Sequence, residues 1–316
     1  MRVVGPEAVD RALTFPILIE ALADAFRGGI AAPARHHHAM PESGGTLLLM
    51  PAWTGETAGA GGAPLLGVKV VTVFPDNGSR ALPSVQGTYL LMDGGTGTPL
   101  AAIDGTRLTL WRTAAASALA ARHLARPDAA RMVMVGAGAL APFLVRAHAA
   151  VRPLRSVTVW ARRPDAALSL AASLAAEALP AEASDDLEGS VRGADLVSCA
   201  TLATEPLVRG AWLRAGAHLD LVGAFTPVMR EADDEALHRS EVYVDTPAAL
   251  TEGGDVAVAI RAGTFDEASV RGDLAGLVSG RTGGRSGPAA RTMFKSIGAS
   301  LEDLAAAAAI WRRVGG

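Results

Sequence analysis

The sequence has few of the features that mark secreted, membrane or nucleic-acid-binding proteins. Its 316 residues include one cysteine, Cys199, so an internal disulfide is excluded and a reducing compartment is the simplest expectation. The net charge is −3 and no block of like charge occurs, which argues against nucleic acid or a membrane surface as a partner. We find no apolar run long enough for a transmembrane helix, or for a signal peptide at the start. We therefore expect a cytoplasmic protein, with Cys199 as a small core residue rather than a nucleophile.

Aromatic residues are also scarce, at 4%, although 50% of the residues are hydrophobic. The apolar content is mostly Ala, Leu and Val, and such small side chains favour close packing of helices on sheets. The length suggests two domains, at the usual ~100–200 residues per domain. Composition thus predicts a two-domain α/β protein.

The distribution of apolar residues predicts two kinds of unit along the chain. A helix over 5–28 precedes strands near 46–50, 66–74, 84–92 and 99–103, which together resemble an α+β unit. An Ala-rich helix over 112–126 follows. Strands near 131–135, 156–161, 194–199, 217–222 and 241–244 then alternate with helices near 139–151, 165–177, 184–192 and 229–237. Such alternation predicts a parallel sheet covered by helices on both faces.

The last part of the chain carries two further expectations. Residues 272–287 are rich in glycine and predict a loop, and residues 289–313 predict a helix that can return to the first unit. The resulting fold class is a doubly wound Rossmann sheet plus an α+β substrate-binding and dimerisation domain. We expect the latter to comprise residues 1–118 and 293–316, and the Rossmann domain residues 119–292.

A glycine loop follows the first strand of the alternating region. Gly136 and Gly138 with Ala141 form the pattern G-x-G-x-x-A between a buried strand and a helix. The first glycine permits a tight turn, the second lets the backbone approach a pyrophosphate, and the alanine allows close helix–strand packing. The sequence therefore predicts binding of NAD(H) or NADP(H) by the loop, including Ala139 and Leu140, whose N–H groups lie at the helix N-terminus.

The next strand ends at Arg162 and Arg163, where an NAD-preferring site usually has an acid. Arginine pairs with a 2′-phosphate, so we expect NADP(H) to be preferred and NAD(H) to be possible. The alternative is that both arginines are merely solvated at a strand end. Because ligands bind beyond the carboxyl ends of parallel strands, later strand ends should face the nicotinamide. These ends are Ala200, Thr201, Val222 and Gly223.

Three cations stand out in the first unit, Arg35, Lys69 and Arg112. Lys69 lies among Val and Leu, where an unpaired charge is costly to bury. Arg112 opens the expected Ala-rich helix, where a cation opposes the helix dipole. A bound carboxylate would account for both placements, although each side chain alone could bury its stem and expose its charge. The adjacent His36-His37-His38 run does not suit a metal, because neighbours in an extended segment point to opposite faces.

In several stretches the sequence resembles the ornithine cyclodeaminase/mu-crystallin family. The matching stretches occur in order over most of the chain. They are Met50-Pro51-Ala52, Gly67-Val68-Lys69, Leu82-Pro83-Ser84-Val85-Gln86, Thr98-Pro99-Leu100, the RTAAAS run from Arg112, the GAGALA loop from Gly136, Val222-Gly223-Ala224 with Pro227 and Arg230-Glu231, and Phe294-Lys295-Ser296-Ile297-Gly298.

The resemblance implies a homodimer in which Arg35, Lys69 and Arg112 bind the substrate carboxylate. It also implies that Thr113 and Ser296 approach the cofactor. One departure matters: where the cyclodeaminases carry an aspartate that acts on the substrate amine, this chain has Phe225. Phenylalanine cannot hold an ammonium or move a proton. The segment is instead similar to the branch that reduces Δ1-pyrroline-2-carboxylate or Δ1-piperideine-2-carboxylate to proline or pipecolate.

The leading hypothesis is therefore an NAD(P)H-dependent reductase of a cyclic imino acid. Phe225 would pack on the ring methylenes, and the proton would come from a water beside Lys69 or from Glu56 in the Gly-rich loop, so that Lys69 and Glu56 are the candidate catalytic residues. The alternative for Glu56 is an ordinary loop acid. A second hypothesis is an ornithine cyclodeaminase or an amino-acid dehydrogenase. A third is a non-catalytic, NADPH-dependent binding protein, which the mu-crystallin resemblance permits.

Overall fold

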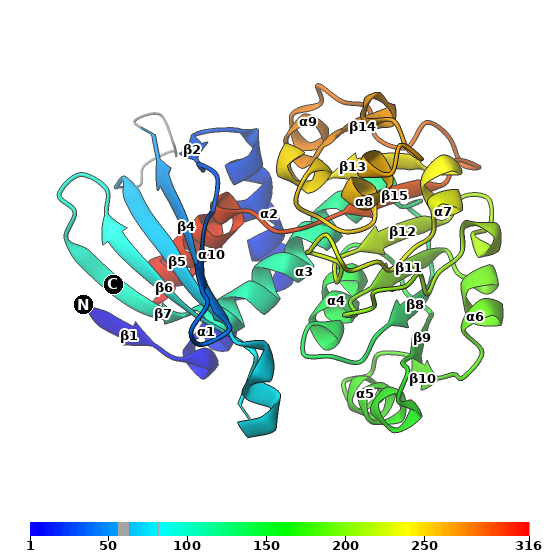
Figure 1. The fold of residues 1–316 in the computed structure, drawn as a ribbon, viewed down its shortest axis with the longest axis horizontal. Coiled ribbons are helices and arrows are strands. Elements are labelled where there is room, and N and C mark those ends of the chain that lie inside the picture. The colour runs from blue at the N-terminus through cyan, green and yellow to red at the C-terminus, as the bar shows by residue number, and fades with distance from the viewer. Residues whose placement is uncertain (56–62, 81, 316) are drawn as a thin grey trace. The chain divides into compact units, whose positions relative to one another are not determined.

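The computed structural model describes residues 1–55, 63–80 and 82–315, which divide into two compact units (Figure 1). Unit 1 comprises Met1–Arg112 and Ala299–Gly316, and unit 2 comprises Thr113–Gly298. The expected boundaries, after residues 118 and 292, are therefore displaced. The second displacement has a clear cause, because a strand of the unit 2 sheet ends at Lys295 and a boundary at 292/293 would cut through it.

Unit 1 is built on a mixed, seven-stranded sheet. Its order is β1-β7-β6-β5-β4-β2, and β3 pairs with β4 away from this path. The four long strands lie close to where the alternating pattern predicts them, whereas the three short ones carry too few residues to show a pattern. The bounds are β1 Arg2–Val4, β2 Ile30–Ala31, β3 His36–Met40, β4 Gly45–Thr54, β5 Leu65–Val73, β6 Val85–Asp93 and β7 Pro99–Asp104.

The helices of unit 1 depart from expectation in two places. The single helix expected over 5–28 is two helices, α1 Pro6–Ala12 and α2 Phe15–Arg27, separated by the extended residues Leu13 and Thr14. Pro16 explains the break, since proline has no N–H to donate and its ring clashes with the carbonyl four residues earlier. The chain returns to this unit as α10, Ser300–Val314.

The Ala-rich helix, α3, runs from Gly105 to Leu124 and starts earlier than expected. Arg112 therefore lies inside this helix and not in its first turn. Contrary to expectation, Arg112 does not oppose the dipole of a helix N-terminus, because the dipole effect is confined to the terminal turns.

Unit 2 contains an eight-stranded sheet in the order β10-β9-β8-β11-β12-β15-β13-β14, and every pair in it is parallel. The order reverses between β8 and β11, which makes this the switch point where ligands bind in doubly wound folds. The bounds are β8 Arg131–Val135, β9 Ser156–Trp160, β10 Ala181–Ala183, β11 Leu196–Cys199, β12 His218–Leu221, β13 Glu241–Val244, β14 Val270–Asp273 and β15 Thr292–Lys295.

Two predictions for the end of unit 2 are wrong. Residues 292–295 were expected in a helix but form β15, which lies between β12 and β13. The four residues, TMFK, are all buried, and so short a run does not distinguish a strand from a helix. Residues 272–287, expected as a loop, contain the end of β14 and a short helix. The helices of this unit are α4 Ala141–Ala149, α5 Pro164–Ala176, α6 Leu187–Gly193, α7 Asp234–His238, α8 Val256–Arg261 and α9 Leu274–Ser279.

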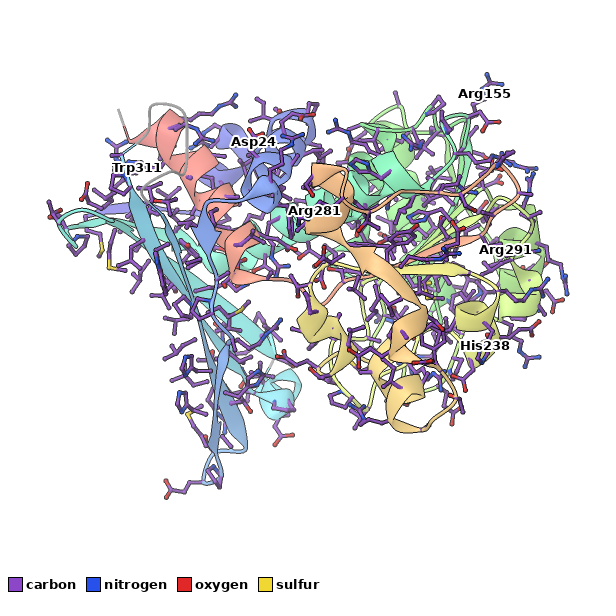
Figure 2. All side chains as sticks on the ribbon, turned by 90° about the horizontal axis from the view of Figure 1, so that it is seen from above. Asp24, Arg155, His238, Arg281, Arg291 and Trp311 are labelled. Carbon is purple, nitrogen blue, oxygen red and sulfur yellow. The ribbon has the colours of Figure 1, made fainter. Side chains whose placement is uncertain are left out.

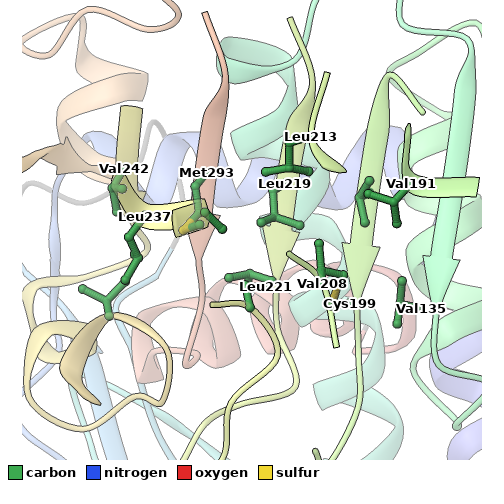
Figure 3. Close-up of a cluster of buried hydrophobic side chains, with 14 of the residues drawn as sticks. Val135, Val191, Cys199, Val208, Leu213, Leu219, Leu221, Leu237, Val242 and Met293 are labelled. Carbon is green, nitrogen blue, oxygen red and sulfur yellow. The ribbon is translucent and has the colours of Figure 1, made fainter. Parts of the chain in front are cut away.

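Apolar side chains from the central strands of unit 2 form a continuous core (Figure 3). Val135, Leu219, Leu221 and Met293 are buried there, and Cys199 lies among them with no exposed surface. Burial raises the pKa of the Cys199 thiol well above its usual value, so the group stays protonated. The expectation that Cys199 is a core residue is confirmed. None of the helices in the described residues combines the length and apolar character needed to cross a membrane.

Candidate active site

The glycine loop of unit 2 has the shape that a pyrophosphate requires. Gly136 has a φ of +114°, and a Cβ there would lie 2.5 Å from the carbonyl oxygen of Ala200. A Cβ at Gly138, in contrast, would meet nothing within 4 Å. Among the described residues, the N–H groups of Gly138, Ala139 and Leu140 donate to no acceptor. The loop therefore fits a dinucleotide, with an open approach at Gly138 and free donors before α4.

The strand ends expected to line the cofactor site lie beside this loop. The N–H of Ala200 donates to the carbonyl of Val135, the last residue of β8 (2.9 Å). A Cβ at Gly223, after β12, would lie 2.2 Å from the carbonyl oxygen of Thr201, after β11. The segments after β8, β11 and β12 thus touch one another at the carboxyl edge of the sheet. Val222 lies in the same segment as Gly223 and is buried.

Other predicted residues of unit 2 are exposed. Arg162 and Arg163 lie between β9 and α5 with exposed side chains. Phe225 follows Gly223 and is 42% exposed, a large value for phenylalanine. An exposed aromatic side chain at the end of a central strand is available for contact with a ligand.

Two predicted residues of unit 2 are buried instead. Ser296 donates its hydroxyl hydrogen bond to Asp245 Oδ2 (3.1 Å), and Thr113 begins the unit 2 part of α3. Lys295, which belongs to the same family stretch as Ser296, is fully buried and pairs with Asp255 (3.2 Å).

Asp220, in β12, is fully buried among polar side chains. Its carboxylate accepts hydrogen bonds from the hydroxyls of Ser117 (2.9 Å) and Ser198 (2.6 Å), and His148 Nε2 lies 3.2 Å away. Burial opposes ionisation of Asp220, but the hydrogen bond with His148 and its neighbours lower the pKa overall. The group links α3 and α4 to the sheet.

The cations of unit 1 meet anions of their own chain. Lys69 Nζ lies 2.8 Å and 2.9 Å from the two carboxylate oxygens of Asp303. Arg112 donates from Nε to Asp303 Oδ1 (3.0 Å) and from Nη1 to Glu302 Oε2 (2.9 Å). Lys69 is 2% exposed and Arg112 5%, while neither acid has any exposed surface. The inference that these cations need a bound carboxylate is therefore wrong as first argued, because Glu302 and Asp303 already neutralise them.

Neither Glu302 nor Asp303 was predicted as a site residue. A signal for them exists, since two adjacent acids begin a helix that is otherwise rich in Ala and Leu. Acids at a helix start are favourable for the dipole alone, so the pattern does not identify a buried partner. Lys69 and its partner Asp303 are 234 positions apart, and only the fold joins them.

The local environment of Lys69 changes its acidity. Burial lowers the pKa of Lys69 to about 8; Asp303 opposes this shift and Arg112 adds to it.

Lys69 pairs across the sheet with Tyr89, and a Cβ at Gly67 would lie 2.2 Å from the Tyr89 hydroxyl oxygen. Gly67 thus leaves the space that Tyr89 fills. Burial raises the pKa of Tyr89 well above its usual value, and Asp303 contributes to this shift.

Arg35 and Glu56 complete the predicted set for unit 1. Arg35 is half-buried and immediately precedes β3, whose first residue pairs with Leu49. One residue further in this register would place Arg35 opposite Met50, which pairs with Lys69. The register thus brings Arg35 to the row of the sheet that contains Lys69. Glu56 lies outside the described residues.

The chain thus joins a parallel, dinucleotide-binding sheet with an open glycine loop to a second unit that buries a lysine and an arginine beside two acids. It belongs to the ornithine cyclodeaminase/mu-crystallin family, whose model matches residues 4–316.

Relatives of stated activity cover nearly the whole chain. A Δ1-pyrroline-2-carboxylate reductase of Paracoccus denitrificans is 40% identical over 274 residues, which are 86% of this chain and 84% of the relative. The structure of the Thermococcus litoralis Δ1-pyrroline-2-carboxylate reductase, in complex with NADH and L-proline, has a TM-score of 0.92 and 31% identity and covers 99% of this chain and 97% of the other. An archaeal alanine dehydrogenase dimer with bound NAD has a TM-score of 0.90 and 27% identity over 99% and 95% of the two chains.

Proposed function

We propose that the protein reduces a cyclic imino acid, Δ1-pyrroline-2-carboxylate or Δ1-piperideine-2-carboxylate, to proline or pipecolate with NADPH or NADH. The likeness over 99% of the chain to a reductase in complex with NADH and L-proline carries this proposal. The reduced nicotinamide supplies a hydride to the imine carbon, and a proton adds to the nitrogen. Phe225 supports the assignment against ornithine cyclisation, because its ring has no group that can hold the substrate amine.

The charges of unit 1 suit such a substrate. Arg35, Lys69 and Arg112 would bind the substrate carboxylate, as the family resemblance implies. Together they carry one positive charge more than Glu302 and Asp303, which matches a single carboxylate. The two acids also offset the positive charge that would otherwise oppose protonation of the imine nitrogen. Protonation matters because an iminium carbon accepts hydride far more readily than a neutral imine.

Lys69 is our candidate for the proton donor. A general acid is most effective when its pKa lies near the working pH, and the pKa of Lys69 is lowered to about 8. Its ammonium can lose a proton to the substrate nitrogen, after which Asp303 still holds the neutral amine in place through a hydrogen bond. Glu56 is the second candidate for this role.

The decisive experiment supplies purified protein with each imino acid and compares NADPH with NADH. We expect loss of cofactor absorbance with formation of proline or pipecolate. Absence of turnover above the blank with both ring sizes would reject the proposal. Ammonia release from ornithine would instead favour a cyclodeaminase, and ligand binding without turnover would favour a binding protein.

We also propose a preference for NADPH, supported by the exposed Arg162 and Arg163 at the end of β9. Arginine binds a 2′-phosphate through paired, charge-assisted hydrogen bonds. The double variant R162A/R163A should raise the Kd for NADPH and leave that for NADH nearly unchanged. R155A, at another exposed arginine of unit 2, is the matched control. Equal losses with both cofactors would remove the support for this preference.

A homodimer is the assembly we propose, through the open face of the unit 1 sheet. Buried strand residues such as Met50, Tyr89 and Leu91 alternate with accessible ones. The accessible ones are mostly apolar and include Pro51, Trp53, Val68, Val70, Leu90 and Ala102. Figure 2 shows α2 and α10 on one side of this sheet and only side chains on the other.

An apolar sheet face of this kind favours association with a second copy. The variant V68K/L90K should sediment as a monomer if the wild type is a dimer. L168K, at a 59% exposed leucine of α5, should leave the mass unchanged. A dimer that persists in V68K/L90K would exclude this face as the interface.

A further inference from the structure

A buried glutamate connects two segments at the carboxyl edge of the unit 2 sheet. Glu231 has no exposed surface, and its two carboxylate oxygens accept four hydrogen bonds. Oε1 accepts from the N–H of Thr201 (2.7 Å) and from the Thr201 hydroxyl (2.8 Å). Oε2 accepts from the N–H groups of Gly223 (2.8 Å) and Ala224 (3.2 Å). One side chain therefore satisfies donors from both the segment after β11 and the segment after β12.

These two segments border the glycine loop. A Cβ on Gly136 would lie 3.2 Å from Thr201 Cγ2, and one on Gly223 would lie 2.4 Å from Glu231 Oε1. A continuous chain of contacts thus runs from the glutamate through Thr201 to Gly136. A shift of the Glu231 carboxylate would be transmitted to the loop that fits a dinucleotide, since packed neighbours leave little free space.

Glu231 is itself fixed by a second acid. Asp255 Oδ1 accepts hydrogen bonds from the N–H groups of Glu231 (2.8 Å) and Ala232 (3.0 Å). Its other oxygen lies 3.2 Å from Lys295 Nζ, on the strand next to β12. Asp255 also has a φ of +36°, a conformation that a residue with a side chain adopts only when its surroundings hold it there. Such strain is found where a structure maintains a functional geometry.

We infer that Glu231 is a positioning residue of the cofactor site, where its carboxylate holds the segments after β11 and β12 in the arrangement that receives the nicotinamide nucleotide. This inference rests on the proposed function, which requires that cofactor. Glu231 itself does not contact the cofactor in this role. It acts through Thr201, Gly223 and Ala224.

Only a carboxylate has the required hydrogen-bonding capacity. Four donors converge on two oxygens, and an ionised carboxylate accepts at both. A glutamine would turn its amide nitrogen, which only donates, toward one pair of donors. That pair would lose its acceptor, and the two segments would no longer be held by the same group.

The test compares E231Q with a control at the opposite edge of the same sheet. Asp195 is also buried and also accepts from backbone donors, the N–H groups of Ala130 (3.1 Å) and Arg131 (3.0 Å). These donors lie at the amino end of β8, and Asp195 itself immediately precedes β11. D195N should therefore destabilise unit 2 without affecting the cofactor site. The direct readout is the Kd for NADPH alone, measured by calorimetry, with thermal unfolding of each variant recorded beside it.

We expect E231Q to raise the Kd by at least about tenfold and D195N to leave it within about twofold, even where the two lower the unfolding temperature equally. An unchanged Kd in E231Q would overturn the inference, as would an equal loss in D195N. If E231Q does not fold, E231D is judged by the same criteria, since it retains a carboxylate but one methylene too short to reach both segments. Failure of the wild type to bind NADPH or NADH would instead overturn the proposed function.

Discussion

Glu302 and Asp303 in unit 1 and Glu231 in unit 2 are buried carboxylates with different kinds of partner. In unit 1, Asp303 and Glu302 accept hydrogen bonds from the side chains of Lys69 and Arg112. In unit 2, Glu231 accepts three of its four hydrogen bonds from backbone N–H groups and the fourth from a hydroxyl. The first arrangement balances charge against charge, and the second joins segments of main chain.

This difference matters for function because side-chain pairs can rearrange and backbone attachments cannot do so without moving the fold. A ligand carboxylate that enters unit 1 can take over donors from Asp303, since Lys69 and Arg112 carry several N–H groups each. The carboxylate of Glu231 has no such freedom. We therefore regard the cluster of Lys69, Arg112, Glu302 and Asp303 as the part that responds to substrate, and Glu231 as part of the frame.

The largest expected effect comes from D303N, which breaks the charge balance of unit 1. It leaves Lys69 and Arg112 buried with Glu302 as their one remaining charged partner in the cluster. Removing one partner of a buried ion pair typically costs about 3–5 kcal/mol. We expect a loss of this size in the free energy of unfolding, measured by chemical denaturation.

D24N is the matched control for that experiment. Asp24 pairs with Arg27 on the surface of α2, with side-chain exposures of 76% and 50%. Exposed pairs contribute little, so D24N should stay within about 0.5 kcal/mol of the wild type. If D303N behaved like D24N, the charge balance in unit 1 would have no energetic importance.

The parts of the fold that follow from local patterns could be predicted from the sequence. The glycine loop from Gly136 and the strands of the alternating region are determined by residues close together in the sequence. The structure contains them close to the expected positions. The family motifs predicted the family of the chain, and the match of the family model to residues 4–316 confirmed it. What failed has two causes. The strand β15 is too short for its period to be read. The start of α3 at Gly105 has a local signal that the helical pattern alone does not use, because Asp104 caps this helix by accepting from the N–H of Arg107 (2.6 Å).

Only part of the candidate site could be predicted, because the rest depends on tertiary context. Lys69 is conspicuous because a cation among Val and Leu is unusual, and this correctly indicated a buried charge. Its anion was sought in a ligand, whereas Asp303 lies far away in sequence on α10. Glu231 was recognised only as part of a motif, since no local pattern reveals that its carboxylate reaches Thr201 and Gly223.

A second prediction concerns the pH dependence that the unit 1 cluster gives to catalysis. Burial lowers the pKa of Lys69 to about 8, so the side chain is protonated below that pH and loses its proton above it. If Lys69 donates the proton, kcat/KM should fall about tenfold per pH unit above pH 8. K69R, whose guanidinium stays charged, should be much slower but should lack this decline. A decline of equal midpoint in K69R would assign the titration to the substrate.

The smallest effect is expected in unit 2, from titration of Glu231. Burial raises the pKa of Glu231 to about 7, with Asp255 adding to the shift and Lys295 opposing it. Because a protonated carboxyl accepts fewer hydrogen bonds, the Kd for NADH should rise as pH falls, by up to about tenfold between pH 8 and pH 6. NADH is chosen because it lacks the 2′-phosphate, which titrates in the same range.

The matched variant for this titration is E231Q, which keeps the other titratable groups around the site, Asp255, Lys295, Cys199 and Asp220. Its Kd for NADH should be higher than that of the wild type at pH 8 and nearly independent of pH, since the group that titrates has been removed. A pH dependence that persists in E231Q would show that the titrating group is not Glu231. The frame of unit 2 would then respond to protons through a residue other than the one that joins its two segments.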